Sequence, residues 1–421
     1  MTKNISKELQ EKIYKLLHWN QRYFKIDMIY LVEGGSWLTL GQIVSSITSF
    51  LLAVIFANFL SKEDYGTYKY VLSLVGILNI FTLPGMGTAL IQTVARGYDG
   101  SLISVVKSKI CWGILGSFVS LILAGYYFVH GNTLLGISFI ISAIFIPFMD
   151  SFSIYSSFLY GKKCFNIASK YGIISQIIAT LLLIFSLFLT ENLLFILVIY
   201  FLSWTLLRFI FFIITTKKFL SNQEKDPEVI SYGKHLSLMG IISTIAYQID
   251  RLLVFHYLGA TEVAIYSVAI APLEQIKGLL KNIGPLALPK FAERSKEEIK
   301  KTIFKKILFF FSAISSIVII YIFSAPFLFK VFFPFYLNSV FYSQIFSFSL
   351  LPTAFYLIGT VALQSQKKQK QLYQLNIIGS IIEIILLFVL IREYGLLGAI
   401  LARIVSRFIG GIFALKLVKT I

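Results

Sequence analysis

Apolar residues fill long runs over most of the chain, and each run is about as long as the 20 or so residues that a helix needs to cross a bilayer. Six runs precede a polar stretch at residues 215–234, and six follow it. The predicted spans are residues 35–60, 67–92, 110–129, 133–158, 167–189, 191–214, 235–258, 263–285, 305–329, 340–363, 372–391 and 395–415. The pattern therefore predicts an all-α integral membrane protein with about twelve transmembrane helices.

The polar stretch TTKKFLSNQEKDPEVISYGK is the expected boundary between two lobes. It separates an N-lobe at residues 34–214 from a C-lobe at residues 235–421, and residues 215–234 form a cytoplasmic linker.

Residues 1–33 lack the uninterrupted apolar core and the cleavage site of a signal peptide. Apolar residues there recur at helical spacing between lysines, which predicts an amphipathic helix in the membrane interface, with a disordered basic tail as the alternative. The apolar positions are Ile5, Leu9, Ile13 and Leu16.

Lysine and arginine are sorted between alternate loops. If the N-terminus is cytoplasmic, the cytoplasmic segments hold about 28 basic residues and the opposite loops about four, as the positive-inside rule requires. The four are Lys62, Lys69, Lys330 and Arg392. Both termini are therefore predicted to be cytoplasmic.

The overall composition agrees with this topology. Hydrophobic residues make up 57% of the chain and charged residues 14%, which excludes a water-soluble protein. The formal net charge of +18 also suits a nucleic-acid partner, but such apolarity does not, so no nucleic acid is expected.

The two halves of the chain repeat each other weakly. An offset of 198 residues matches several positions, and an offset of 205 matches Pro147 with Pro352. The pairs at the first offset include Ser45 with Ser243, Leu60 with Leu258, Tyr68 with Tyr266 and Arg96 with Arg294. Each half holds an even number of spans, so the two six-helix pseudo-repeats point the same way across the membrane. Parallel repeats of this kind are typical of transporters with a site between two lobes.

Two prolines occupy corresponding positions inside predicted spans. Pro147 lies in the fourth span and Pro352 in the tenth, where each removes a backbone donor and kinks its helix. A static packing kink is one interpretation. The repeated placement favours the other, in which both prolines are hinges that let the lobes rock.

Ionisable residues inside the spans are the strongest candidates for a functional site, because they are costly in lipid and face a polar interior. They are Asp150, Arg208, Asp250, Arg251, Glu274, Lys277, Lys281, Glu383, Arg403 and Arg407. Arg208 and Lys281 lie near cytoplasmic ends, where snorkelling is the simpler explanation. Asp250 with Arg251, and Glu274 with Lys277, are each also interpretable as local structural pairs.

The cations of the second half predict a binding site for an anionic substrate, and a diphosphate is the obvious biological one. The predicted diphosphate-binding residues are Lys277, Arg403, Arg407, Arg251 and Lys281. The acids of the spans are the candidates for coupling to a proton or sodium ion. They are Asp150, Asp250, Glu274 and Glu383.

The sequence contains no catalytic constellation. Its four histidines have no metal-ligand spacing, and no Walker A loop is present, so we expect no enzyme, no metal site, no cofactor and no ATP hydrolysis in this chain. Energy for transport must then come from an ion gradient, the membrane potential or substrate flow.

Two segments resemble a known family of transporters. EDYGTYKYVLSLVGILNIFTLPGMGTALIQTVARG (63–97) is similar to the second-span region of Wzx-type oligosaccharide-lipid flippases, and residues 250–293 resemble the corresponding second-half region. These flippases belong to the multidrug/oligosaccharidyl-lipid/polysaccharide (MOP) exporter superfamily, and the likeness covers roughly residues 30–418. The resemblance implies two six-helix bundles in a V, as in MATE transporters.

The resemblance also implies a function. Such a protein moves undecaprenyl-diphosphate-linked oligosaccharide from the inner to the outer leaflet of the bacterial cytoplasmic membrane. The expected partners are that lipid-linked oligosaccharide, membrane lipid and the polysaccharide polymerase or chain-length machinery, and the protein is expected to be a monomer. One alternative is a drug/cation antiporter of the same superfamily, for which a net acidic cavity is expected. The other is a membrane polysaccharide polymerase or ligase. The latter usually carries a large external loop, whereas the external loops predicted here are short.

Overall fold

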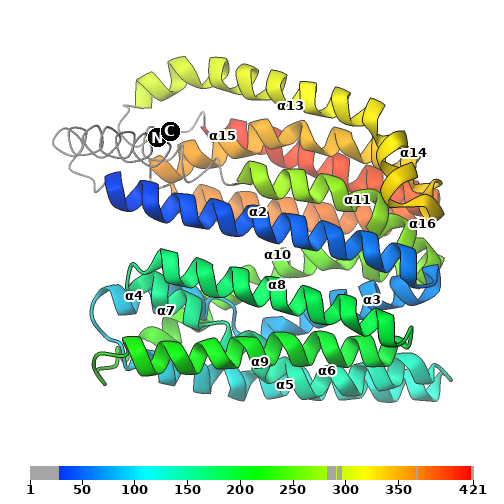
Figure 1. Cartoon of the computed structure of the whole chain (residues 1–421). Helices are drawn as coiled ribbons and strands as arrows, with labels where there is room; N and C mark the ends of the chain where they lie inside the picture. The colour runs from blue at the N-terminus through cyan, green and yellow to red at the C-terminus, as the bar shows by residue number, and fades with distance from the viewer. Residues whose placement is uncertain (1–27, 282–290, 292–295, 367, 419–421) are drawn as a thin grey trace, which may run out of the picture.

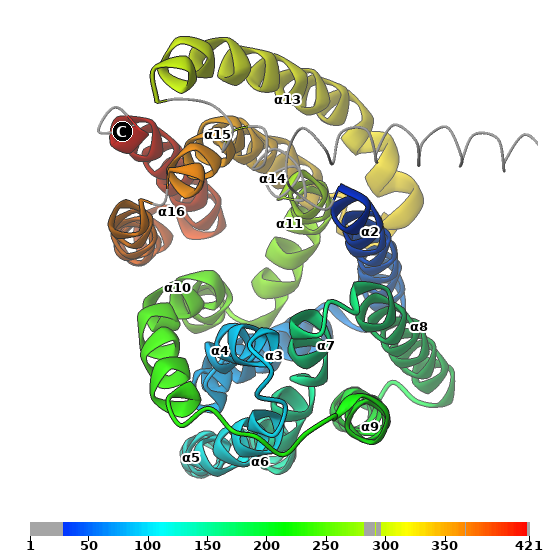
Figure 2. The ribbon, with the colours of Figure 1, turned by 90° about the vertical axis from the view of Figure 1, so that its left-hand side faces the viewer.

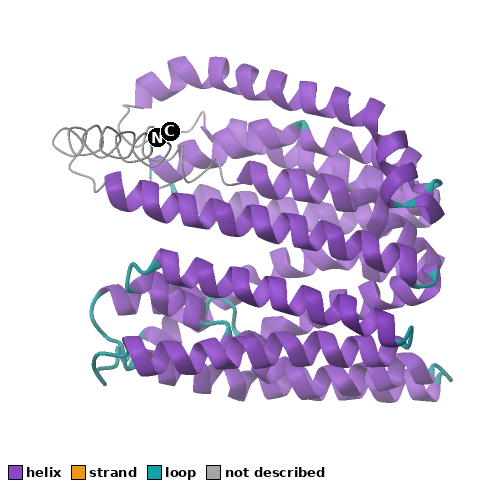
Figure 3. Ribbon diagram, viewed as in Figure 1, coloured by secondary structure: helices purple, strands orange, loops and turns teal. Residues whose placement is uncertain are grey.

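The computed structural model describes residues 28–281, 291, 296–366 and 368–418, and the regular structure of these residues is entirely helical (Figure 3). The amphipathic helix expected within residues 1–33 lies almost wholly outside them. Long helices run side by side across the molecule, and their loops gather at its two ends (Figure 1). The predicted all-α fold is confirmed.

The first half contains five unbroken or nearly unbroken helices and one bent span. Its elements are α2 (Met28–Phe59), α3 (Lys62–Leu78), η1 (Asn79–Thr82), α4 (Met86–Ala95), α5 (Ser101–Val129), α6 (Thr133–Phe152), α7 (Tyr155–Gly161), α8 (Phe165–Leu189) and α9 (Leu193–Phe219). The axes on either side of Leu83-Pro84-Gly85 differ by 45°, so the second span is broken where the sequence places a proline and a glycine together.

The second half repeats this arrangement. Its elements are α10 (Val229–Leu258), α11 (Ala260–Lys281), α13 (Lys296–Phe332), η2 (Pro334–Tyr336), α14 (Ser339–Ser347), η3 (Phe348–Leu350), α15 (Pro352–Ser365) and α16 (Gln369–Val418). Helix α16 contains two spans, because its backbone leaves the helical conformation at Gly395, where φ is +57°. A Cβ atom on Gly398 would lie 1.8 Å from the carbonyl oxygen of Leu390, so the chain turns sharply there.

The described part of the chain contains twelve segments that can each span a membrane. Ten of its helices are long and apolar enough to span a membrane, and the bent pair formed by α3–η1 and α4 makes an eleventh. The division of α16 at Gly395 gives the twelfth. Large apolar side chains such as Phe323, which is 81% exposed, cover the outer surface as lipid-facing residues do.

The packing between helices has the same pattern in both halves (Figure 2). Helix α2 packs against α8 of its own half and against α11 of the other half. Its counterpart α10 packs against α16 of its own half and against α3 and α4 of the other. This matching set of neighbours supports the two six-helix pseudo-repeats that the sequence offsets predicted.

The two halves approach closely at the end of the molecule that carries the loops 59–62, 258–260 and 332–339. A Cβ atom on Gly66 would lie 1.8 Å from the carbonyl oxygen of Ala260, so α3 and α11 touch there only because residue 66 is glycine. Close by, the amide of Asn58 donates to the carbonyl oxygen of Phe332 over 2.9 Å. The rings of Tyr65 and Tyr336 also meet edge to face, with centroids 6.5 Å apart.

The two candidate hinge prolines lie beside interruptions of the fourth and tenth spans. Pro147 is inside α6, which continues to Phe152 before the break at Ser153 and Ile154. Pro352 begins α15 directly after the 3-10 turn η3. Both spans are therefore divided, and the hinge role of the two prolines stays a prediction.

Candidate substrate cavity and ion-pair network

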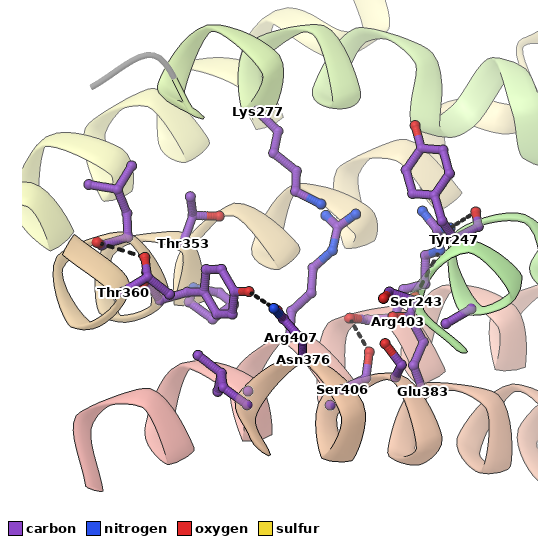
Figure 4. Close-up of a pocket in the computed structure, with 18 of the residues that line it drawn as sticks. Ser243, Tyr247, Lys277, Thr353, Thr360, Asn376, Glu383, Arg403, Ser406 and Arg407 are labelled. Carbon is purple, nitrogen blue, oxygen red and sulfur yellow. Dashed lines mark hydrogen bonds and ion pairs between the residues drawn. The ribbon is translucent and has the colours of Figure 1, made fainter. Parts of the chain in front are cut away.

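A cavity of about 610 Å³ lies in the second half, between α10, α11, α15 and the two segments of α16 (Figure 4). Polar residues from all four elements line it, among them Ser243, Tyr247, Lys277, Thr353, Thr360, Asn376, Glu383, Arg403, Ser406 and Arg407. Lys277 from α11 and Arg407 from α16 extend toward each other across the open space (Figure 4). Both residues were predicted to bind an anionic substrate.

Arg403 is the centre of an ion-pair network on one side of this cavity. Its guanidinium lies 2.9 Å from the carboxylate of Asp250 and 3.6 Å from that of Glu274. A third carboxylate, that of Glu383, lies 3.5 Å from its Nε atom. The same guanidinium donates a hydrogen bond to the carbonyl oxygen of Tyr247 over 3.0 Å. One buried cation therefore joins α10, α11 and both segments of α16.

Glu274 bridges three cations. Besides Arg403, it accepts a hydrogen bond from Arg407 and lies 3.9 Å from the ammonium group of Lys277. Arg407 also donates to the hydroxyl of Ser349 over 2.8 Å. Lys277 and Arg407 thus share one carboxylate with Arg403, and this pairing holds them at the cavity wall.

Asp250 anchors the other end of the network. The hydroxyl of Tyr266 donates to its carboxylate over 2.8 Å, and the guanidinium of Arg251 lies 3.9 Å away. Asp250 and Arg251 do not form a purely local pair, because the shortest ion pair of Asp250 is with Arg403 on another helix.

The network carries a surplus of positive charge. Three acids and four cations take part, namely Asp250, Glu274, Glu383, Arg251, Lys277, Arg403 and Arg407. Pairing lowers the cost of holding these charges away from water, and the cations outnumber the acids by one. The side chain of Lys281, the remaining predicted cation, lies outside the part that the structure describes.

Asp150 lies apart from this network, in the first half. Its carboxylate is 2.9 Å from the ammonium group of Lys109 and accepts a hydrogen bond of 2.9 Å from Thr82. The sequence analysis missed Lys109 because its third span began at residue 110, whereas α5 begins at Ser101 and Lys109 is only 2% exposed. A search that extended each apolar run to its helix cap would have found it.

Lys69 is a second residue that the sequence analysis misplaced. It was counted among the loop lysines, but it lies in α3 and lines a cavity of about 230 Å³ between α2, α3, α8 and α9. Its ammonium group lies over the ring of Tyr65, 5.3 Å from the centroid. Residue 69 already falls within the predicted span 67–92, so the error was to count Lys69 with the external loops; α3 begins seven residues before it, at Lys62.

Arg208, the remaining intramembrane cation, lines another cavity of about 480 Å³ in the first half. It donates to the carbonyl oxygen of Met149 over 2.9 Å, and its guanidinium lies over the ring of Trp204, 4.8 Å from the centroid. These contacts direct Arg208 inward, so snorkelling to the membrane surface does not explain it. Among the described residues, no group of histidine, cysteine, aspartate and glutamate side chains is suited to hold a metal ion.

Residues 31–293 match the model of a protein family described as polysaccharide biosynthesis protein. The chain is also 23% identical over 399 residues to a putative O-antigen transporter of Shigella flexneri, an alignment that covers 88% of this chain and 93% of the relative.

Solved structures share the fold. The lipid II flippase MurJ in an inward closed conformation superposes with a TM-score of 0.72 at 17% identity, over 90% of this chain and 87% of that one. An inward-facing multidrug resistance MATE family transporter of the MOP superfamily superposes with a TM-score of 0.67 at 13% identity, over 90% and 97%. The chain therefore belongs to the polysaccharide biosynthesis protein family, in agreement with the resemblance seen in its sequence, and it shares the fold of MATE transporters and MurJ.

Proposed function

We propose that this protein flips undecaprenyl-diphosphate-linked oligosaccharide from the inner to the outer leaflet of the bacterial cytoplasmic membrane by alternating access. The family match and the O-antigen transporter relative support a lipid-linked oligosaccharide as the substrate class. The observation that carries the proposal is the cavity lined by Lys277 and Arg407, in a network with one more cation than acids.

Of the three cations that line the cavity, Lys277 and Arg407 are the groups that meet the diphosphate. Arg407 has five N–H donors in a planar fork that matches phosphate oxygens, and Lys277 adds a mobile point charge. Glu274 holds both of them until substrate arrives, so the diphosphate competes with this carboxylate for Arg407. Arg403 and Arg251 position Asp250, while the prenyl chain stays in lipid.

Release of Glu274 offers a route to ion coupling. When the diphosphate binds Arg407, Glu274 loses its closest counter-ion inside the membrane. Because an uncompensated carboxylate is costly there, the affinity of Glu274 for a proton or a sodium ion rises. Of the four acids predicted for coupling, Glu274 alone pairs with Lys277 and Arg407. An ion gradient or the membrane potential, which is worth about 2.3 kcal/mol per charge and 100 mV, then biases the cycle.

Alternating access requires that the contact at Gly66 and Ala260 opens. We assign this end to the external side and both termini to the cytoplasm, as the loop charges predict. The lobes at residues 34–214 and 235–421, joined by the linker at 215–234, would then rock about the interrupted fourth and tenth spans.

A drug/cation antiporter fits the cavity less well. A cationic drug needs a carboxylate that is available to it, whereas Asp250, Glu274 and Glu383 each lie within 4 Å of an arginine. A polymerase or ligase is excluded by the family and its transporter relatives.

The test is glycan export in a strain that lacks the chromosomal gene and carries a plasmid copy. We expect the Lys277→Ala/Arg407→Ala variant to lose surface glycan, with the lipid-linked saccharide accumulating on the inner leaflet. The matched control is Lys370→Ala/Arg392→Ala, which removes two exposed cations from α16. Normal export by the Lys277/Arg407 variant at wild-type membrane levels would refute the cationic site.

A further inference from the structure

The first half contains a cavity that corresponds to the substrate cavity of the second half. It is lined by α2, α7, α8 and α9, the repeat counterparts of α10, α15 and the two segments of α16. The cavity adjoins the smaller chamber that holds Lys69, and the two share Gln176 and Trp204 in their walls. Together they follow α2, α8 and α9 along the length of the first half.

The residues that line the two cavities also correspond in sequence. Ser45 and Ser243, matched by the repeat, each line their own cavity. One offset in residue number matches the lining residues of α8 with those of the first segment of α16. A second offset matches the lining residues of α9 with those of the second segment. The matched lining pairs are Gly172 with Gly379, Gln176 with Glu383, Trp204 with Arg403, and Arg208 with Arg407.

The two cavities differ in their counter-ions. Arg407 is neutralised by Glu274, but the offset that matches Tyr68 with Tyr266 places Gly76 at the position of Glu274. The acid Glu383 is likewise replaced by the neutral Gln176. As a result, no carboxylate lines either chamber of the first half among the described residues.

Arg208 and Lys69 are accordingly cations without an ion pair in the described part of the chain. Arg208 has a backbone carbonyl and the face of Trp204 as neighbours, and Lys69 has the face of Tyr65. The carboxylate of Asp150 also acts on Arg208, but its ion pair is with Lys109. Two cations, Lys109 and Arg208, thus share the single carboxylate of Asp150, and Lys69 has no acid in its chamber, so the region keeps a positive surplus. Such charges are costly inside the membrane and mark substrate or ion sites. The remaining wall is rich in neutral hydrogen-bonding side chains, which suit an oxyanion. They are Gln42, Ser45, Ser153, Tyr155, Ser156, Tyr160, Ser169, Ser175 and Gln176.

We propose that this cavity is a second anion site, in which Arg208 binds a phosphate or diphosphate group and Lys69 adds positive charge from the adjoining chamber. Two sources supply this chemistry, a prenyl diphosphate headgroup and free phosphate. The first source rests on the proposed flippase function, whereas the site itself does not.

Trp204 provides a direct readout, because the guanidinium of Arg208 lies over its ring. The full chain is purified into lipid nanodiscs with its other three tryptophans, Trp19, Trp37 and Trp112, replaced by phenylalanine. Farnesyl diphosphate and inorganic phosphate are then titrated separately while Trp204 fluorescence is recorded. We expect a saturable change, lost in Arg208→Gln, weakened at least tenfold in Lys69→Gln and retained in Arg208→Lys.

Two controls separate this site from others. Lys217→Gln removes an exposed cation from the same helix α9 and is expected to leave the titration unchanged. Arg407→Ala is expected to stop export yet keep the Trp204 response, so failure of the proposed function and failure of this site are distinguishable. A response to farnesyl diphosphate alone identifies the headgroup as ligand, and a response to both probes identifies a general phosphate site. No saturable change with either probe, or equal affinity in Arg208→Gln, overturns the proposal.

Discussion

Arg403 and Asp250 form an ion pair of 2.9 Å between two spans that are far apart in the sequence, and neither side chain is more than 3% exposed. This pair connects α10, which contacts the first half of the protein, with the last span of the second half. It therefore couples the geometry of the candidate cavity to the interface between the halves.

Replacing Arg403 by alanine is expected to destabilise the protein strongly. The change leaves three carboxylates without their shared cation, and breaking a buried pair by removing one partner costs about 3–5 kcal/mol. Thermal unfolding in detergent, followed by the loss of monodisperse protein, measures the effect. Arg392→Ala, at an exposed position of the same helix, is the control. An unchanged unfolding midpoint for Arg403→Ala would show that the network contributes nothing to stability.

The pair formed by Lys109 and Asp150 is expected to show strong coupling in a double-mutant cycle. Lys109→Met leaves the half-buried Asp150, and Asp150→Asn leaves the buried Lys109, without its closest partner, whereas the double variant leaves neither charge. We expect the double variant to be more stable than the sum of the two single effects predicts, by about 0.5–3 kcal/mol. Additive effects on the unfolding midpoint would contradict this arrangement.

Substituting Gly66 by alanine is expected to reduce transport at least tenfold. The new Cβ atom would lie 1.8 Å from the carbonyl oxygen of Ala260, so α3 and α11 can no longer close against each other. Surface glycan is measured at matched protein levels in the membrane. Gly125→Ala is the control, because a Cβ atom there meets nothing within 4 Å. Equal export by the two variants would mean that this contact is not used in the cycle.

The hinge prediction is tested by the Pro147→Ala/Pro352→Ala variant. If both prolines permit rocking, restoring the missing backbone donors should lower the export rate at least tenfold without lowering the unfolding midpoint. Pro326→Ala, at an exposed position of α13, supplies the comparison. Static kinks would instead give normal export by the double variant.

The sequence by itself determined the membrane class, the spans and the candidate charges. Apolar runs define spanning helices because lipid offers no partner for an unpaired backbone amide, so each run must satisfy its own hydrogen bonds locally. The same cost confines ionisable residues to polar interiors, which is why Arg403, Arg407 and Glu274 were identifiable from their positions alone. Span ends were less accurate, and this is the reason that Lys109 was missed. Lys69 was misplaced because a lysine near the end of a predicted span was counted with the adjoining loop.

Only the tertiary structure decided which of these charges meet. Helix periodicity places Glu274 and Lys277 on one face, but it carries no information about the helix that this face touches. The packing of α10, α11 and α16 brings Asp250, Glu274 and Glu383 around Arg403, and it leaves Asp150 with Lys109 in the other half. The unequal distribution of acids between two corresponding cavities likewise emerges only from the fold, because an ion pair depends on a distance of a few ångströms between helices that are distant in sequence.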